Sequence, residues 1–147
     1  HALQALRAAT RCEAGQSWQW DGVRFDVLHP QAQDYETAAK SNAMSCVLRI
    51  SNGAQTFLLT GDIEQRQEAQ LLAAGAALKS AVLLVPHHGS KTSSSAAFLD
   101  AVAPDIALVQ AGYRNRFGHP AAPVMARYSQ RAVRVIDSAH CGAARWQ

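Results

Sequence analysis

Residues 55–85 read QTFLLTGDIEQRQEAQLLAAGAALKSAVLLV, and this stretch decides the fold class. It begins with a mostly apolar segment, Gln55–Thr60, that has the length of a strand. The hydrophobic period then changes, because Ile63–Ala74 is rich in good helix formers and Asp62 stands in the position of an N-cap. Ala81–Val85 is a short, continuous apolar run, which is typical of a strand buried on both faces. The stretch therefore predicts a strand, a helix and a second, buried strand.

The segments on either side extend this pattern. Upstream, Ser17–Trp20 and Val23–His29 flank Asp21-Gly22, a favoured two-residue hairpin turn. A second hairpin is predicted around Ser51-Asn52-Gly53. The remaining expected elements are a short helix at 2–9, a polar loop at Pro30–Ala43, a strand at Met44–Ile50, a serine-capped helix at Ser93–Val102, a buried strand at Asp105–Gln110, a helix at Pro120–Arg131, a buried strand at Val133–Asp137 and a short edge strand at Ala143–Trp146. Two hairpins followed by strand–helix alternation predict a mixed-sheet α/β layer in one domain over residues 1–147.

Composition limits the classes of protein to consider. The chain has 147 residues, 48% of them hydrophobic, which is enough for one domain with a core. Its formal net charge of +3 is compatible with a polyanionic partner but far from the dense basic stripe of many nucleic-acid-binding domains. The three cysteines are far apart and odd in number, so we expect no disulfide framework, and Cys46 in its apolar run should be a buried small side chain. His1 is not a natural first residue, so we expect an excised part of a longer protein.

Polar clusters follow three of the apolar strands, where α/β proteins usually place their sites. The first cluster ends at Asp62, a carboxylate that suits a metal ligand bridging two cations but that an ordinary N-cap would also explain. The second is His87-His88-Gly89-Ser90, with Lys91 and a serine run behind it. Adjacent histidines point to opposite sides of an extended chain, so at most one should face a given metal. The serine run offers donors for a phosphate, or it caps a helix.

The third cluster is Gly112–Pro120, in which two arginines, two aromatic side chains and His119 lie close together. Arg114 and Arg116 can grip a phosphodiester and the aromatic rings can stack on bases, although a solvated surface loop would have the same composition. Because each cluster follows a strand, we expect the three clusters to converge on one edge of the sheet, where their aspartate and histidines could share a metal site. Aspartate and histidine are ligands for zinc or manganese.

Three longer stretches resemble a known family. They are FLLTGDIE (57–64), LLVPHHGSKTSSS (83–95) and ALVQAGYRNRFGHP (107–120). Together they are similar to the C-terminal metallo-β-lactamase-like domain of the ComEC family of DNA-internalisation competence proteins. GQSWQWDGVRFDVLHP (15–30) and SNAMSCVLRI (41–50) also resemble the hairpin and the strand entry of that domain, so the resemblance covers nearly the whole chain. It implies the C-terminal portion of an αββα sandwich that holds two divalent metal ions, zinc or manganese, at one edge.

The resemblance also implies roles for individual residues. Asp62 would be the bridging carboxylate, one of the two adjacent histidines, His88 in preference to His87, would bind the first metal, and His119 would bind near the second. Asp62, His88 and His119 should then lie within roughly 10 Å of one another, as ligands of a shared metal cluster would. His87 would lie behind the ligands or contact the phosphate. The implied reaction is metal-assisted phosphodiester hydrolysis, in which Asp62 and His88 are the catalytic residues. The groups expected to neutralise the phosphate are His87, Ser90, Lys91, Arg114 and Arg116.

Partners and location are implied in the same way. The partners would be DNA, as a single strand or an incoming duplex, and the membrane-embedded channel part of the parent protein. The parent would lie in the inner (plasma) membrane, with this domain soluble on its extracytoplasmic side. Two alternatives stay open: a non-catalytic module that guides DNA, and a hydrolase of another phosphodiester, such as a phosphocholine ester of the cell wall.

One feature of the family is missing. Its HxHxDH-type motif, which supplies most of the metal ligands, has no match in residues 1–56, and we expect it upstream of this chain. The chain by itself should therefore bind metal weakly or not at all and lack nuclease activity. Side chains that would pack on the upstream part should be exposed, which favours a homodimer.

Overall fold

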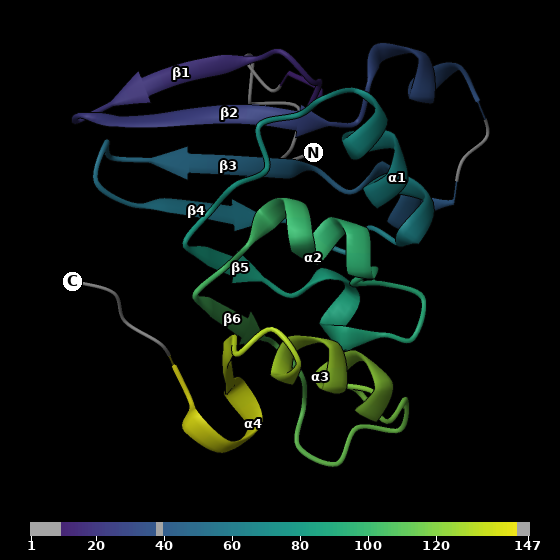
Figure 1. Cartoon of the computed structure of the whole chain (residues 1–147). Helices are drawn as coiled ribbons and strands as arrows, with labels where there is room; N and C mark the ends of the chain where they lie inside the picture. Colours follow the sequence, from purple (N-terminus) through teal and green to yellow (C-terminus); the bar gives the residue numbers. More distant parts are fainter. Residues whose placement is uncertain (1–9, 38–39, 144–147) are drawn as a thin grey trace, which may run out of the picture.

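The computed structural model describes residues 10–37 and 40–143, which form one seven-stranded sheet with helices (Figure 1). The strand order follows the chain, β1 to β7. Pairing is antiparallel from β1 to β4 and parallel from β4 to β7, which confirms the predicted mixed α/β sheet. The strands are β1 (Ser17–Trp20), β2 (Val23–His29), β3 (Val47–Ser51), β4 (Thr56–Leu59), β5 (Val82–Leu84), β6 (Ile106–Val109) and β7 (Arg134–Asp137).

Helices follow the parallel strands one by one. They are α1 (Gln65–Ala73), α2 (Ala96–Val102), α3 (Ala122–Ser129) and the short α4 (Ser138–Cys141). Three 3₁₀ turns lie in the connections: η2 (Ala32–Glu36), η3 (Ser41–Met44) and η4 (Pro86–Gly89). The first two occupy the segment predicted as a polar loop, and α4 was not predicted. The helix predicted at 2–9 lies outside the described residues, as does most of the edge strand predicted at Ala143–Trp146.

Both predicted hairpins are confirmed, and local turn chemistry explains them. Asp21 and Gly22 have φ values of 50° and 77°, the left-handed pair that a tight two-residue turn between twisted strands requires. In the second turn the side-chain oxygen of Asn52 accepts hydrogen bonds from the backbone N–H groups of Ala54 and Gln55, at 3.1 and 2.8 Å. An asparagine that closes its own turn in this way pins the register of β3 against β4.

Two boundary predictions were wrong. α1 begins at Gln65 and its N-cap is Glu64, not Asp62, because Glu64 and Gln67 form a reciprocal capping box. The side chain of Asp62 is thereby left outside the helix. The last strand was predicted to be buried, but β7 is a half-exposed edge strand with a partner on one side only, β6.

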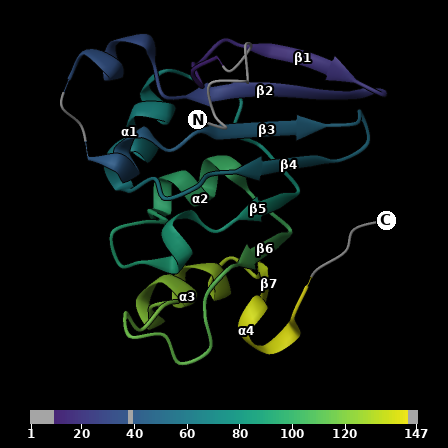
Figure 2. The same cartoon turned by 180° about the vertical axis from the view of Figure 1, so that it is seen from behind.

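The core lies between the sheet and α1, α2 and α3 (Figures 1 and 2). Consecutive parallel strands that are added in one direction through right-handed crossovers place all of their helices on the same face. Alternate strand residues therefore point at the helices. This core contains Val47, Leu58, Ile63, Leu71, Leu78, Leu83, Val85, Phe98, Leu99, Val102, Ala107, Val109, Ala121, Val124, Tyr128 and Val133.

The opposite face of the sheet is also aliphatic. Leu48 pairs with Leu59, and Leu84 and Ile136 flank Leu108, so these five side chains point away from the helices. They are only half-buried and do not belong to the core beneath the helices. We refer to these five residues as the open face. Within residues 10–37 and 40–143, no helix is long and apolar enough to cross a membrane.

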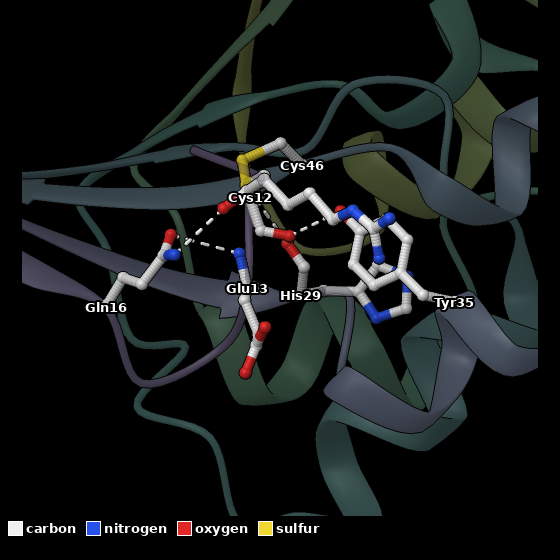
Figure 3. Close-up of a disulfide and its surroundings, with 7 residues drawn as sticks. Cys12, Glu13, Gln16, His29, Tyr35 and Cys46 are labelled. Atoms are coloured by element: carbon white, nitrogen blue, oxygen red, sulfur yellow. Dashed lines mark hydrogen bonds between the residues drawn. A yellow bond between two sulfur atoms is a disulfide. The ribbon is translucent and has the colours of Figure 1, made fainter. Parts of the chain in front are cut away.

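A disulfide joins Cys12 to Cys46, with Cα atoms 5.9 Å apart (Figure 3). This single disulfide was not predicted from the sequence, where no disulfide framework was expected. The expectation that Cys46 is buried was wrong, because Cys46 is exposed. The β1–β2 hairpin returns the chain to its start: the Ala14 N–H donates to the Pro30 carbonyl at 2.8 Å. The Tyr35 hydroxyl donates to the Cys12 carbonyl at 2.6 Å. Hydrogen bonds of Cys12 and Ala14 thus support the chain around the disulfide.

Candidate functional site

The carboxyl ends of β4, β5 and β6 bring the three predicted clusters together. Asp62 follows β4, His87 and His88 lie in η4 directly after β5, and His119 ends the loop that follows β6. Parallel neighbours end at the same edge of a sheet, so segments far apart in the sequence meet there. His87 is the common neighbour, since its ring centroid lies 6.3 Å from that of His88 and 5.9 Å from that of His119.

The two adjacent histidines both adopt left-handed backbone conformations. His87 has φ 48° and ψ 44°, and His88 has φ 56° and ψ 18°. The rule that neighbouring side chains point to opposite sides holds for extended backbone and not for this one, so both rings reach the same edge of the sheet. Which of the two would face a metal stays a prediction. Left-handed backbone costs an L-residue roughly 1–2 kcal/mol, and such strain concentrates at functional sites.

His88 is oriented by its backbone neighbour. Its Nδ1 lies 2.6 Å from the carbonyl oxygen of Gln110. A carbonyl can only accept, so Nδ1 carries the proton, and in the neutral ring Nε2 presents a lone pair. That Nε2 lies 3.4 Å from Oδ1 of Asp62. A histidine whose far nitrogen donates to a carbonyl is the usual arrangement behind a metal-ligating imidazole.

Asp62 is itself held in place. Its backbone N–H donates to the Ser45 hydroxyl at 3.0 Å, and a Cβ added to the preceding Gly61 would lie 3.0 Å from the Ser45 Cβ. The backbone thus passes close to the entry of β3, and the half-buried carboxylate faces His88.

His87 contacts two residues that sequence reasoning missed. Its Nδ1 lies 3.4 Å from Oε1 of Glu64 and its Nε2 lies 3.3 Å from the side-chain nitrogen of Asn42. Glu64 also accepts a hydrogen bond from the Thr92 hydroxyl at 2.9 Å. Asn42 comes from η3, far upstream in the chain, and only the fold brings it to the site. Nothing in the sequence near Glu64 distinguished it from an ordinary acid at a helix start.

His119 is the least satisfied of the site histidines. Its ring stacks on Phe117, with centroids 5.9 Å apart and planes 17° apart. Its Nδ1 is buried and, like the Nδ1 of His87, has no hydrogen-bond partner among the described residues. Burial lowers the pKa of His119, and the neighbouring His87 and His88 lower it further. The neutral ring is therefore favoured, as a metal ligand requires.

The three ligand candidates and His87 form two neighbouring pairs. Asp62 faces His88, and His119 lies beside His87. Within the part of the chain that the structure describes, no three histidine, cysteine or acidic side chains form a group that could hold a metal ion.

The predicted phosphate contacts differ in exposure. Lys91, Arg114 and Arg116 are exposed, whereas Ser90 is buried and shares a hydrogen bond of 3.1 Å with the Thr92 hydroxyl. The serine run behind the histidines was predicted either to offer donors to a phosphate or to cap a helix, and in the structure it caps a helix and its groups are engaged inside the protein. The backbone N–H groups of Ser94 and Ser95 donate to the carboxylate of the buried Glu68. Ser95 caps α2 by accepting from the N–H of Phe98.

The loop between β6 and α3 has a fixed shape. The side chain of Asn115 donates to the carbonyls of Gly112 and His119, at 3.0 and 2.6 Å, and accepts from the N–H groups of Phe117 and His119. Arg114 lies over the ring of Tyr113 and Arg116 over that of Phe117. The loop therefore presents two exposed cation–aromatic pairs beside the histidines.

Comparison with known proteins identifies the family, although no family model matches the chain. The chain is 40% identical over 131 residues, 88% of its length, to Competence protein ComA of Neisseria gonorrhoeae. It is 39% identical over 136 residues to Recombination protein 2 of Haemophilus influenzae and 35% identical over 138 residues to ComE operon protein 3 of Bacillus subtilis, over 92% and 91% of its length. The chain belongs to the ComEC family of competence proteins. It spans 17–18% of the length of these relatives, so it corresponds to a small part of each ComEC-family protein.

Proposed function

We propose that this ComEC-family domain hydrolyses DNA phosphodiesters with two divalent metal ions during natural transformation. The observation that carries the proposal is the geometry of His88, whose Nδ1 donates to a carbonyl while its Nε2 faces Asp62. The name of one relative, Competence protein ComA, supplies the biological setting.

Asp62, His88 and His119 would hold the metals. The donor set fits zinc or manganese, and the unpartnered, buried Nδ1 of His119 is a nitrogen for which the described residues offer no other partner. The chain supplies only part of a two-metal ligand set, so the remaining ligands would come from the HxHxDH-type motif expected upstream. When bound, the metals would supply Lewis-acid activation of water and charge neutralisation at the phosphate.

The protein's own groups would position the substrate. Arg114 and Arg116 are exposed on a rigid loop next to His119 and would hold phosphates on either side of the cleaved bond. Lys91 would add a further positive charge. His87, which lies between Glu64 and Asn42, would stand behind the metal ligands or contact the phosphate.

The rest of the αββα sandwich would come from the parent protein. The open face is aliphatic and half-buried, and a second sheet from the upstream part of the parent would cover it. In the isolated chain the same face would favour a homodimer. The Cys12–Cys46 disulfide supports a place outside the cytoplasm, because such bonds persist in oxidising compartments. The parent would then sit in the inner membrane, with this domain next to its channel part.

The deciding experiment uses the intact parent protein. Asp62→Asn should nearly abolish DNA cleavage and transformation, because a neutral amide bridges two cations poorly. Asp21→Asn, in the hairpin turn at the opposite end of the sheet, is the matched control and should act like wild type. The double change Arg114→Ala with Arg116→Ala should weaken DNA binding and reduce its salt slope by about one per lost phosphate contact.

The two alternatives make different predictions. A module that only guides DNA would tolerate Asp62→Asn and lose function with the arginine changes. A hydrolase of another phosphodiester would leave DNA intact but cleave a small ester. Wild-type transformation by Asp62→Asn would end the nuclease proposal.

A further inference from the structure

A cavity of about 460 Å³ opens directly beside the candidate centre. Its lining includes His88, Gln110, Ala111, Phe117, His119 and Ser138. Two of these residues, His88 and His119, are also ligand candidates. A group bound at the centre is therefore adjacent to the cavity, whose volume lies in the range of roughly 300–1,000 Å³ that holds small organic groups.

The cavity has one aromatic wall. Phe117 is 66% exposed and its ring is stacked on His119, which fixes the plane that it presents. The loop that carries Phe117 is held by the four hydrogen bonds of the Asn115 side chain, so the wall is formed before any ligand arrives. A rigid aromatic plane beside an open, mostly apolar hollow suits a flat ring system.

The residues that line the cavity include the polar Gln110 and Ser138. Gln110 is exposed, and its backbone carbonyl is already used by His88 while its side-chain amide carries both a donor and an acceptor. The Ser138 hydroxyl bonds the backbone of Ala111 and keeps the floor in place. A side-chain amide beside an aromatic ring can pair with the edge of a nucleobase. Arg116, at 4.8 Å from the centre of the Phe117 ring, adds a positive charge for the phosphate.

We propose that this cavity receives one unstacked nucleobase of a single-stranded polynucleotide, stacked on Phe117, while the adjoining phosphate lies at Asp62 and His88. The inference rests on the proposed function for the position of the phosphate. A base inside a duplex is covered on both faces by its neighbours, so it cannot enter the cavity without leaving the stack. The domain would therefore prefer single strands or frayed ends to intact duplex.

The test measures binding by the full 147-residue chain in the presence of EDTA, so that no metal contributes. The probes are a fluorescent oligothymidylate of roughly 12 nucleotides and a duplex of the same length. Phe117→Ala should weaken binding of the single strand by about 5- to 150-fold, the range measured when one base loses its aromatic partner, and should change duplex binding less than about two-fold. Phe117→Trp should restore single-strand binding.

Tyr113→Ala is the matched control. Tyr113 is 64% exposed and also lies beside an arginine, at 5.3 Å, but does not line the cavity. It should weaken single-strand binding less than Phe117→Ala does. Equal effects of the two changes, equal losses on single strand and duplex, or no measurable single-strand binding by the wild-type chain would each overturn the inference.

Failure of the inference and failure of the proposed function can be told apart. Phe117-dependent binding of single strands in a parent protein that does not cleave DNA would leave the cavity assignment standing and remove the hydrolysis. Cleavage that is indifferent to Phe117→Ala would do the reverse.

Discussion

Gly89→Ala probes the contact between η4, which carries His87 and His88, and the segment that carries His119. Gly89 has φ +79°, and an added Cβ would lie 2.7 Å from the Cβ and 3.1 Å from the Cα of Pro120. Pro120 cannot rotate away, because these are ring and backbone atoms and the N–H of Ala121 is bonded to the Gly89 carbonyl at 2.9 Å. The backbone of η4 would therefore have to move away from the segment that carries His119.

The magnitude has two parts. A left-handed backbone costs an L-residue roughly 1–2 kcal/mol, and overpacking at a site that cannot relax costs roughly 1–3 kcal/mol more. Gly75→Ala isolates the first part, since Gly75 has φ +64° and open space around the added Cβ. Both changes remove the same glycine freedom from the unfolded chain, so that contribution cancels between them.

Urea denaturation of the two variants and the wild type measures the difference. Gly89→Ala should lower the free energy of unfolding by about 2–5 kcal/mol and Gly75→Ala by about 1–2 kcal/mol, which separates their midpoints by roughly 1 M. Coincident midpoints would refute the close contact between η4 and the segment after His119.

Three further predictions concern the rest of the domain. Reducing the Cys12–Cys46 bond should lower the free energy of unfolding by about 3–4 kcal/mol, which is the loop-closure entropy for a separation of 34 residues. Urea unfolding with and without reductant measures this difference, and Cys141→Ser, at an exposed free thiol, should leave it unchanged. Equal unfolding curves with and without reductant would contradict the bond. Burial raises the pKa of Glu68 above its ordinary value of 4.5, so the folded protein keeps a proton that the unfolded chain releases. The contribution of Glu68 to stability should therefore fall as pH rises from 4.5 through the folded pKa. Glu68→Gln should flatten this dependence in urea unfolding at stepped pH, and an unchanged slope would contradict the raised pKa. The isolated chain should hold zinc weakly, because structural and catalytic zinc sites need three or four placed ligands, and stoichiometric zinc found by elemental analysis after dialysis would contradict this.

Features with a local physical cause could be predicted from the sequence. The hairpin at Asp21-Gly22 depends on two residues that tolerate left-handed backbone, and the strand at Val82–Leu84 depends on an uninterrupted apolar run. The approach of Asp62 to His88 also followed from sequence, because both come directly after neighbouring parallel strands.

Features that depend on distant contacts could not be predicted. Cys12 and Cys46 are neighbours because β2 pairs with β1 on one side and with β3 on the other. Asn42 and Glu64 meet His87 through packing between η3, η4 and the start of α1, which no periodicity reports. The left-handed backbone of the adjacent histidines contradicts their own conformational preference, so a rule based on extended chain failed there.

The agreement between strand order and chain order has a consequence for how the domain is assembled. Each strand from β2 onward pairs with the strand synthesised just before it, so the sheet can grow by one edge without waiting for a distant partner. The site is then built in the same sequence: Asp62 arrives with β4, the two histidines of η4 with β5, and His119 only after β6. The candidate site is complete only when the segment after the β6 loop packs against Gly89.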